Sequence, residues 1–308
     1  MKNKIVTVGS IAIDELHTPK GSRSNIIGGS ATFFSIAASR YNPVKVIGIV
    51  GNDFPQEGWD LFKKYNINVD LITIENGETF SWGGKYSDDY STRDTLYTNL
   101  GVFENYTPDI NQSINTEYLY LGNIQPALQL DVINKIDNKK RIVSDTMNLW
   151  INLDKKGLWG VIEKSDIFML NDEEAIELTG KKDLYEIAND FLKMGPDTVI
   201  IKKGAKGSIL LTDSTSLDIP VYDKIELFDP TGAGDSFAGG LVGYFSKFGE
   251  DDLVEAMIHA TVTASYTVSD FGVQGLIESS EVVGLSPMEC TPPTSLINAN
   301  APEILLSL

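Results

Sequence analysis

Residues 229–240 read DPTGAGDSFAGG, a loop of small residues that leads into the apolar stretch SFAGGLVGYFSKF at 236–248. The glycines of this loop leave the backbone free to turn consecutive N–H groups toward one point. The apolar stretch predicts a helix that begins at the same point and adds roughly half a positive charge there. The sequence therefore predicts an anion-binding site formed by the backbone amides of Gly232, Ala233 and Gly234.

A carboxylate, Asp235, lies at this helix start, where other phosphate-binding loops place a lysine. Transfer of a phosphoryl group requires that its negative charge be stabilised and that the proton of the attacking hydroxyl be accepted. We predict that the amides of residues 232–235 do the first and that Asp235, as general base, does the second. We also expect the helix start to keep this carboxylate ionised at neutral pH. The alternative is an Asp N-cap without a catalytic role.

On both sides of the loop, short apolar runs alternate with helical patterns. The runs are almost uninterrupted, as in buried parallel strands: KIVTVG (4–9), VKVIGIVG (44–51), YLYLG (118–122), RIVSD (141–145), DIFMLN (166–171) and TVIIKKG (198–204). The patterns with helical period are SATFFSIAASRY (30–41), EGWDLFKKY (57–65), ALQLDVINKID (127–137), DEEAIELTG (172–180) and LYEIANDFLKMG (184–195). This alternation predicts an α/β fold with a mostly parallel sheet and helices on both faces.

Two segments interrupt the alternation. Residues 11–27 carry no helical period, and residues 77–103 alternate polar with aromatic residues around the turn SDDYS, as a hairpin does. We expect a small β-sheet lid, inserted into a single domain over residues 1–308, that closes over a substrate. The aromatic residues of the lid are expected to pack a sheet face, whereas Arg93 is expected to reach a phosphate or a polar substrate.

Three further groups of residues are candidates for a site, and each has a structural alternative. Asn171 and Glu174 follow a predicted strand and have the spacing of a capping box or of a strand-end Mg2+ site. The loop KKGAKG at 202–207 is either a plain hairpin turn or a cationic contact for phosphate. Asp14 is a surface carboxylate or an acceptor for substrate hydroxyls, which the glycine pair 28–29 would let approach the backbone.

Composition narrows the classes of function. The 308 residues include 43 acidic and 25 basic side chains, so the formal net charge of −18 argues against nucleic-acid or anionic-membrane partners. One cysteine and two histidines exclude a disulfide framework and a Cys-based zinc cluster, and argue against a Ser–His–Asp triad. The run IVTVGSIAI is too short to span a bilayer, and we find no basic N-terminal region with a clear small-residue cleavage site. We therefore expect a cytoplasmic protein.

These motifs together resemble the ribokinase (PfkB) carbohydrate kinase family. DPTGAGDSFAGG resembles its C-terminal signature, and IGGSATFFSIAASR at 27–40 resembles its N-terminal glycine-pair region. The resemblance extends from VGSIAID at 8–14 to the region after residue 251. It implies a three-layer αβα sandwich with a lid, and a kinase that transfers the γ-phosphate of ATP to a sugar hydroxyl. A nucleoside kinase of the adenosine type, or a non-catalytic sensor on the same fold, is the alternative.

The resemblance also implies roles for individual residues. Asp235 is the base and the amides of 232–234 form the anion hole. The family's N-x-x-E motif places Asn171 and Glu174 near Mg2+. Bound ATP would contact Lys202, Gly204, Gly207 and Thr231, and the acceptor would contact Asp14, Gly28, Gly29 and Arg93. In many relatives a monovalent cation such as K+ binds between residues 259–275 and the loop at 229–231, and two lids form a homodimer.

Overall fold

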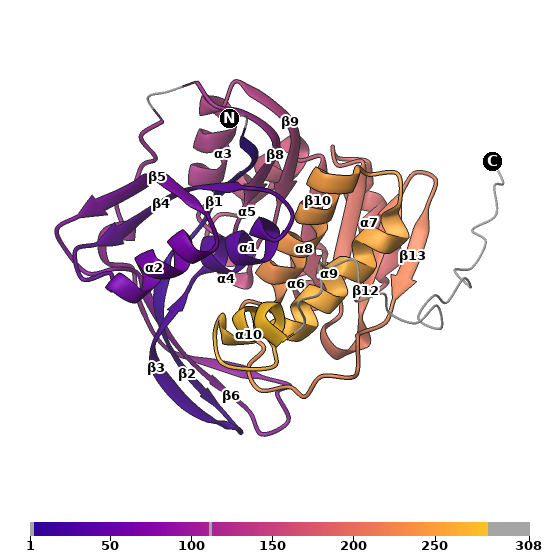
Figure 1. Ribbon diagram of the computed structural model, residues 1–308. Coiled ribbons are helices and arrows are strands. Elements are labelled where there is room, and N and C mark those ends of the chain that lie inside the picture. The colour runs from indigo at the N-terminus through magenta and orange to yellow at the C-terminus, as the bar shows by residue number, and fades with distance from the viewer. Residues whose placement is uncertain (1–2, 111–112, 283–308) are drawn as a thin grey trace, which may run out of the picture.

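The computed structural model describes residues 3–110 and 113–282, and its centre is a nine-stranded sheet (Figure 1). The strand order is β13-β12-β11-β10-β9-β8-β1-β4-β5. The strands are β1 (Asn3–Val8), β4 (Val44–Gly51), β5 (Asn68–Glu75), β8 (Asn115–Leu121), β9 (Asn138–Ser144), β10 (Ile167–Asn171), β11 (Thr198–Lys202), β12 (Ser208–Thr212) and β13 (Ser216–Ile219). All neighbours from β11 to β5 pair in parallel, whereas β12 and β13 pair antiparallel.

Helices cover both faces of this sheet, which gives three layers (Figure 1). One face carries α1 (Ser30–Ser39), α2 (Gln56–Lys64), α8 (Ala233–Phe248), α9 (Leu253–Thr267) and α10 (Gln274–Val282). The other carries α3 (Pro126–Lys135), α4 (Asn148–Leu153), α5 (Lys155–Lys164), α6 (Asp172–Thr179) and α7 (Leu184–Leu192). Buried strand residues therefore alternate between two cores: Tyr118 and Tyr120 of β8 pack toward α8, while Leu119 and Leu121 pack toward α3.

A second sheet of four strands, in the order β3-β2-β6-β7, is built from the two segments that interrupt the alternation. Its strands are β2 (Ala12–Thr18), β3 (Gly21–Gly28), β6 (Ser81–Tyr86) and β7 (Arg93–Asn99). β2 pairs antiparallel with β3 and parallel with β6, and β6 pairs antiparallel with β7 around the turn at 87–92. Two short 3-10 turns, η1 (Gly101–Phe103) and η2 (Gly204–Lys206), complete the described elements.

The structure confirms the predicted fold class. The six apolar runs form β1, β4, β8, β9, β10 and β11, and the five helical patterns form α1, α2, α3, α6 and α7. The lid role of the small sheet and the single domain over 1–308 stay predictions. The tail from Leu285 and Cys290 lie outside the described residues.

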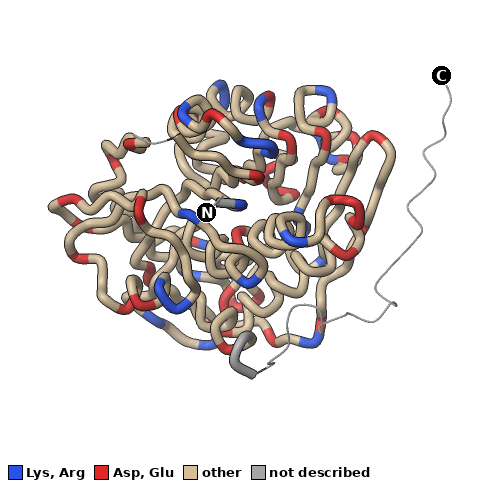
Figure 2. The backbone as a smooth tube through the Cα atoms, turned by 45° about the horizontal axis from the view of Figure 1, so that its top comes forward, with Lys and Arg blue, Asp and Glu red and all other residues tan. Residues whose placement is uncertain are grey.

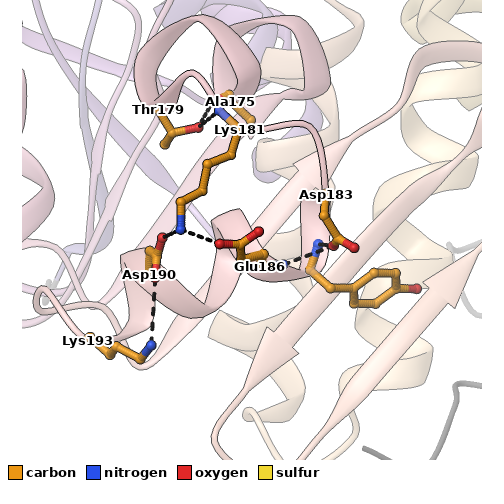
Figure 3. A network of polar contacts seen from close by, with 8 residues as sticks. Ala175, Thr179, Lys181, Asp183, Glu186, Asp190 and Lys193 are labelled. Atoms are coloured by element: carbon orange, nitrogen blue, oxygen red, sulfur yellow. Dashed lines mark hydrogen bonds and ion pairs between the residues drawn. The ribbon is translucent and has the colours of Figure 1, made fainter.

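Charged side chains lie mostly outside the core. Figure 2 shows acidic residues in many surface loops with lysines and arginines between them. One surface network, drawn in Figure 3, joins α6 to α7: Lys181 Nζ contacts Glu186 and Asp190, and Asp183 caps α7 through two backbone N–H groups. Within residues 3–110 and 113–282, no helix is long and apolar enough to cross a membrane.

Candidate active site

The glycine loop ends where α8 begins, and its geometry requires glycine. Gly232 is the N-cap of α8 in a left-handed conformation (φ 75), and a Cβ there would lie 2.4 Å from the ring of Phe33. No side chain caps this helix, and the residues from Gly232 to Asp235 are only half-buried. No side chain therefore covers the amides at the start of α8, although the Ala233 N–H donates to the carbonyl of Pro230 at 3.3 Å, and the loop is open to solvent, which suits an anion.

Asp235 lies in the first turn of α8 and is half-buried. Its Oδ1 accepts a hydrogen bond from the hydroxyl of Tyr120 at 3.4 Å. Burial, followed by the nearby carboxylate of Asp145, raises its pKa to about 7, although Lys202 and the Tyr120 hydroxyl act in the opposite direction. Burial therefore opposes the expected effect of the helix start, which by itself favours the ionised carboxylate.

Lys202, at the end of β11, lies directly over the loop. Its Nζ is 2.5 Å from Asp145 Oδ2 and 3.0 Å from where a Cβ on Gly234 would lie. Burial lowers the pKa of Lys202, but Asp145, Glu174 and Asp235 outweigh this effect and raise it overall. An ammonium group that stays charged therefore lies beside the amides of the anion loop.

Asn171 and Glu174 form the capping box of α6. Asn171 Oδ1 accepts the Glu174 N–H at 2.7 Å, and Glu174 Oε2 accepts the Asn171 N–H at 2.8 Å, so the structural alternative is confirmed. Glu174 is buried, and burial, followed by the charge of Asp145, raises its pKa to about 8. The capping box uses Oε2 and leaves Oε1 for another ligand.

A hydrated Mg2+ ion fits this arrangement. Mg2+ in phosphate-transfer sites takes one or two carboxylates together with water and phosphate oxygens, and does not require a cage of protein ligands. No cluster of three or more His, Cys, Asp or Glu suited to a metal occurs in the part of the chain that the structure describes. Glu174 instead supplies a buried carboxylate whose pKa is raised by burial and by the charge of Asp145, even though Lys202 and Arg93 act to lower it.

Asp14 lies next to the glycine pair Gly28 and Gly29. Asp14 on β2 is buried, and a Cβ on Gly28 would lie 2.0 Å from its Oδ2. Gly29 (φ 93) is the N-cap of α1, where a Cβ would lie 2.4 Å from the carbonyl oxygen of Ser10. Burial, then the charges of Asp229 and Asp235, raise the pKa of Asp14 to about 8. This carboxyl group thus lies within electrostatic reach of the predicted base.

The β6–β7 hairpin of the small sheet reaches the loop before α8. The Tyr86 hydroxyl and Thr231 Oγ1 are 2.8 Å apart, and the Tyr90 hydroxyl donates to the carbonyl of Phe228 at 2.9 Å. Arg93 begins β7 opposite Tyr86, with its guanidinium carbon 5.1 Å from the centre of the Trp82 ring. The small sheet therefore contacts the anion loop directly, and Arg93 lies on that side of the hairpin.

The loop at 229–231 also contacts the segment after α9. Phe228 N–H donates to the carbonyl of Val268 at 2.8 Å, and Gly272 N–H donates to Asp229 Oδ2 at 3.0 Å. These are the two segments between which a monovalent cation is expected, and the cation itself stays a prediction.

Gly204 (φ 53) and Gly207 (φ 88) form the turn after Lys202, with left-handed backbones that favour glycine.

The structure thus brings together Asp14, Glu174, Lys202 and Asp235 at the carboxyl ends of the parallel strands. At this edge β1 lies between β8 and β4, and from β1 the chain adds β4 and β5 on one side of the sheet and β8, β9 and β10 on the other. Ligands of open α/β sheets bind at such a point, where the strand order reverses. Sequence reasoning missed two members. Asp145 follows β9 directly, so the rule that ligands bind at the carboxyl ends of parallel strands could have found it. Tyr120 lies inside an apolar strand, where no sequence pattern shows which face it occupies.

Comparison with known proteins finds relatives that match most of the chain. The model of a family described as pfkB family carbohydrate kinase matches residues 2–280. A cytidine kinase from Thermococcus kodakarensis is 26% identical over 248 residues, which cover 79% of this chain and 88% of the relative. A nucleoside kinase from Methanocaldococcus jannaschii is 25% identical over 284 residues, which cover 88% of this chain and 92% of the relative.

Solved structures share the fold. The crystal structure of the Methanocaldococcus jannaschii nucleoside kinase aligns with a TM-score of 0.74 at 22% identity, covering 91% of this chain and 99% of that chain. An Escherichia coli protein described as a ribokinase II, in complex with ATP and Mg2+, aligns with a TM-score of 0.74 at 20% identity and covers 91% and 98%. At these sequence identities the structural similarity supports the fold and nothing beyond it.

Proposed function

The chain belongs to the PfkB carbohydrate kinase family, a family of phosphotransferases with an alcohol acceptor, and from this premise we propose that it phosphorylates a nucleoside with ATP. The relatives reported above that match most of the chain are named as cytidine and nucleoside kinases, which supports a nucleoside over a free sugar. The complex of a fold relative with ATP and Mg2+ supports ATP as the phosphoryl donor. A free sugar remains the second candidate acceptor because the family includes carbohydrate kinases.

One observation carries the mechanism: a half-buried carboxylate, an anion loop and a half-buried ammonium group meet at the start of α8. We assign Asp235 the role of general base, which takes the proton of the acceptor hydroxyl as its oxygen attacks the γ-phosphorus. The bond from that phosphorus to the ADP oxygen breaks, and ADP leaves. The amides of residues 232–234 and the ammonium of Lys202 stabilise the negative charge on the transferred group.

The remaining residues position the reactants. Asp14 accepts hydrogen bonds from acceptor hydroxyls, which approach closely because Gly28 and Gly29 lack side chains. Arg93 and Thr231 contact the acceptor and the nucleotide at the hairpin side, and Gly204 and Gly207 let the nucleotide approach the turn after β11. Glu174, held by Asn171, would bind Mg2+, which neutralises phosphate charge when bound.

The first prediction concerns the base. Asp235→Asn should lower kcat by several orders of magnitude because no group then accepts the proton, while ADP affinity measured by calorimetry stays within about threefold. ATP consumption is measured with cytidine, adenosine, inosine, ribose and fructose as acceptors.

Asp213→Asn is the control, because Asp213 is an exposed carboxylate in the turn between β12 and β13. Its turnover should equal that of the unchanged protein. Near-normal turnover in Asp235→Asn would reject the base, and consumption with sugars but not nucleosides would reject the nucleoside acceptor.

A further inference from the structure

Tyr120 is a buried residue that contacts the predicted base and that the mechanism above does not use. It lies in β8, is fully buried, and donates its hydroxyl hydrogen bond to Asp235 Oδ1 at 3.4 Å. We infer that Tyr120 is a positioning residue for the base: it holds Oδ1 from the protein interior and leaves Oδ2 to accept the proton of the acceptor hydroxyl. The inference rests on the proposed role of Asp235.

The packing around Tyr120 fixes the position of its hydroxyl. Its ring stacks on Phe34 of α1, with ring centres 3.9 Å apart and planes within 5° of parallel. Phe34 is itself fully buried, and α1 packs against α8, the helix that carries Asp235. A tyrosine enclosed in this way has little freedom to turn, and its hydroxyl requires a partner in the interior. Asp235, which is half-buried, supplies that partner at the boundary between the core and solvent.

The hydrogen bond also has an electrostatic consequence. The charged or titratable groups that face Asp235 are Asp145 after β9, Lys202 at the end of β11, Asp14 on β2 and Tyr120 itself. Asp145 and burial favour the protonated carboxyl, whereas Lys202 and the Tyr120 hydroxyl favour the ionised form. Burial and Asp235 raise the pKa of Tyr120 well above its usual value, so the hydroxyl keeps its proton and donates throughout the working range of pH.

Tyr120→Phe removes the hydroxyl and keeps the ring. Because a hydrogen bond to the ionised carboxylate is lost, the acid limb of kcat/KM against pH should move to higher pH by about 0.5–1 unit. At pH values below the midpoint of this limb, kcat/KM of Tyr120→Phe should be about three- to tenfold lower than that of the unchanged protein. At higher pH the two proteins should have the same kcat/KM, and the KM for ATP should not change at any pH. The acceptor in this assay is cytidine.

The chain offers a matched control on the same strand. Tyr118 faces the same core as Tyr120, and its hydroxyl donates to Glu250 Oε1 at 2.8 Å, a carboxylate in the loop after α8 and not in the site. Tyr118→Phe therefore removes an equivalent hydrogen bond without touching Asp235, and its pH profile should match that of the unchanged protein. A shift common to both variants would show a general effect on the fold and would overturn the inference.

A second measurement needs no acceptor and separates this inference from the proposed function. Infrared spectra recorded against pH show the band of a protonated carboxyl, and subtracting the spectra of Asp235→Asn isolates the contribution of Asp235. The midpoint of that band should rise by about 0.5–1 unit in Tyr120→Phe. An unchanged midpoint overturns the positioning role even if Asp235 is the base. Normal turnover in Asp235→Asn rejects the proposed function instead, and with it the catalytic consequence of the contact.

Discussion

At the scale of single residues, the candidate site contains four buried or half-buried carboxyl groups and one lysine. Asp14, Asp145 and Glu174 are buried, Asp235 is half-buried, and Lys202 pairs directly with Asp145. Each carboxylate loses hydration and lies near others of the same charge, which is why the pKa values of Asp14, Glu174 and Asp235 are raised. Such an arrangement suits a site whose ligands bring hydroxyl protons and a divalent cation.

The contact of Gly28 with Asp14 makes a prediction about acceptor binding. Gly28→Ala adds a Cβ 2.0 Å from Asp14 Oδ2, so the carboxylate must move, although alanine can adopt the backbone conformation of residue 28. We expect kcat/KM for cytidine to fall about 10- to 100-fold, because small displacements of positioning groups have effects of this size. The KM for ATP should change far less, and steady-state kinetics with each substrate varied separately measures both.

A glycine in α5 provides the control for this substitution. A Cβ on Gly160 would lie 3.6 Å from Leu130, an ordinary contact, and Gly160 is not among the site residues. Gly160→Ala should leave the kinetics unchanged and stabilise the fold by about 0.5–1 kcal/mol through helix propensity. Equal losses in kcat/KM for the two variants would contradict the role given to Gly28.

At the scale of elements, the β6–β7 hairpin is tied to the loop before α8 by tyrosine hydroxyls. Tyr86→Phe removes the contact with Thr231, which has an oxygen separation of 2.8 Å. We expect backbone amides of residues 81–99 and 227–232 to exchange hydrogen about fivefold faster, because one hydrogen bond contributes about 1 kcal/mol. Hydrogen-exchange mass spectrometry measures both segments.

Tyr97 of β7 serves as the comparison. Its hydroxyl donates to Glu15 within the small sheet at 3.4 Å and does not reach the loop before α8. Tyr97→Phe should therefore leave the exchange of residues 227–232 unchanged. If Tyr86→Phe also leaves that segment unchanged, the hydroxyl contact does not couple the hairpin to the anion loop.

Elements with strong patterns could be predicted from the sequence, and those without could not. The central parallel strands are apolar throughout because helices cover both of their faces, so they stand out. β5 was missed: it is the edge strand of the large sheet, and its residues, NVDLITIE, are half-buried or exposed and mix polar with apolar side chains. β13, at the other edge, is only four residues long. The hairpin at 77–103 was found through its turn.

The same limit applies to the site. Glycine loops and strand-end carboxylates follow from local sequence, so Asp235, Asn171 and the loop at 202–207 could be proposed. The contact of Tyr120 with Asp235 depends on the packing of β8 against α8 through Phe34, and no local pattern encodes it. Pairing of Lys202 with Asp145 likewise requires the order in which β9, β10 and β11 lie in the sheet.

At the scale of the whole molecule, the buried acids set how stability depends on pH. Asp14 and Glu174 have folded pKa values of about 8 and Asp235 of about 7, all above their values in an unfolded chain near 4. Between about pH 4 and pH 8 the folded state holds protons that the unfolded state has released, so the free energy of unfolding falls as pH rises. Without ligands, the thermal midpoint should be higher near about pH 6 than near about pH 9, as calorimetry can measure.

The net charge of −18 acts in the same direction, because protonation at lower pH reduces self-repulsion. Asp14→Asn separates the two effects: it removes one titrating group, so the change in thermal midpoint between these pH values should become smaller, whereas Asp213→Asn should leave it unchanged. A midpoint that rises with pH across this window would show that the three carboxyl groups are ionised in the folded protein. At lower pH, Asp89, whose pKa is lowered to about 2 by Ser91 and Ser87, begins to oppose the trend.

The site draws its side chains from nearly the whole described chain, from Asp14 on β2 to Asp235 on α8. A polypeptide still emerging from the ribosome presents Asp14, Asp145 and Lys202 long before it presents the base or the glycine loop. Such an unfinished chain lacks part of the candidate site until residues 232–235 have been added. The candidate site is complete only when α8, from the C-terminal part of the chain, packs against α1, from the N-terminal part.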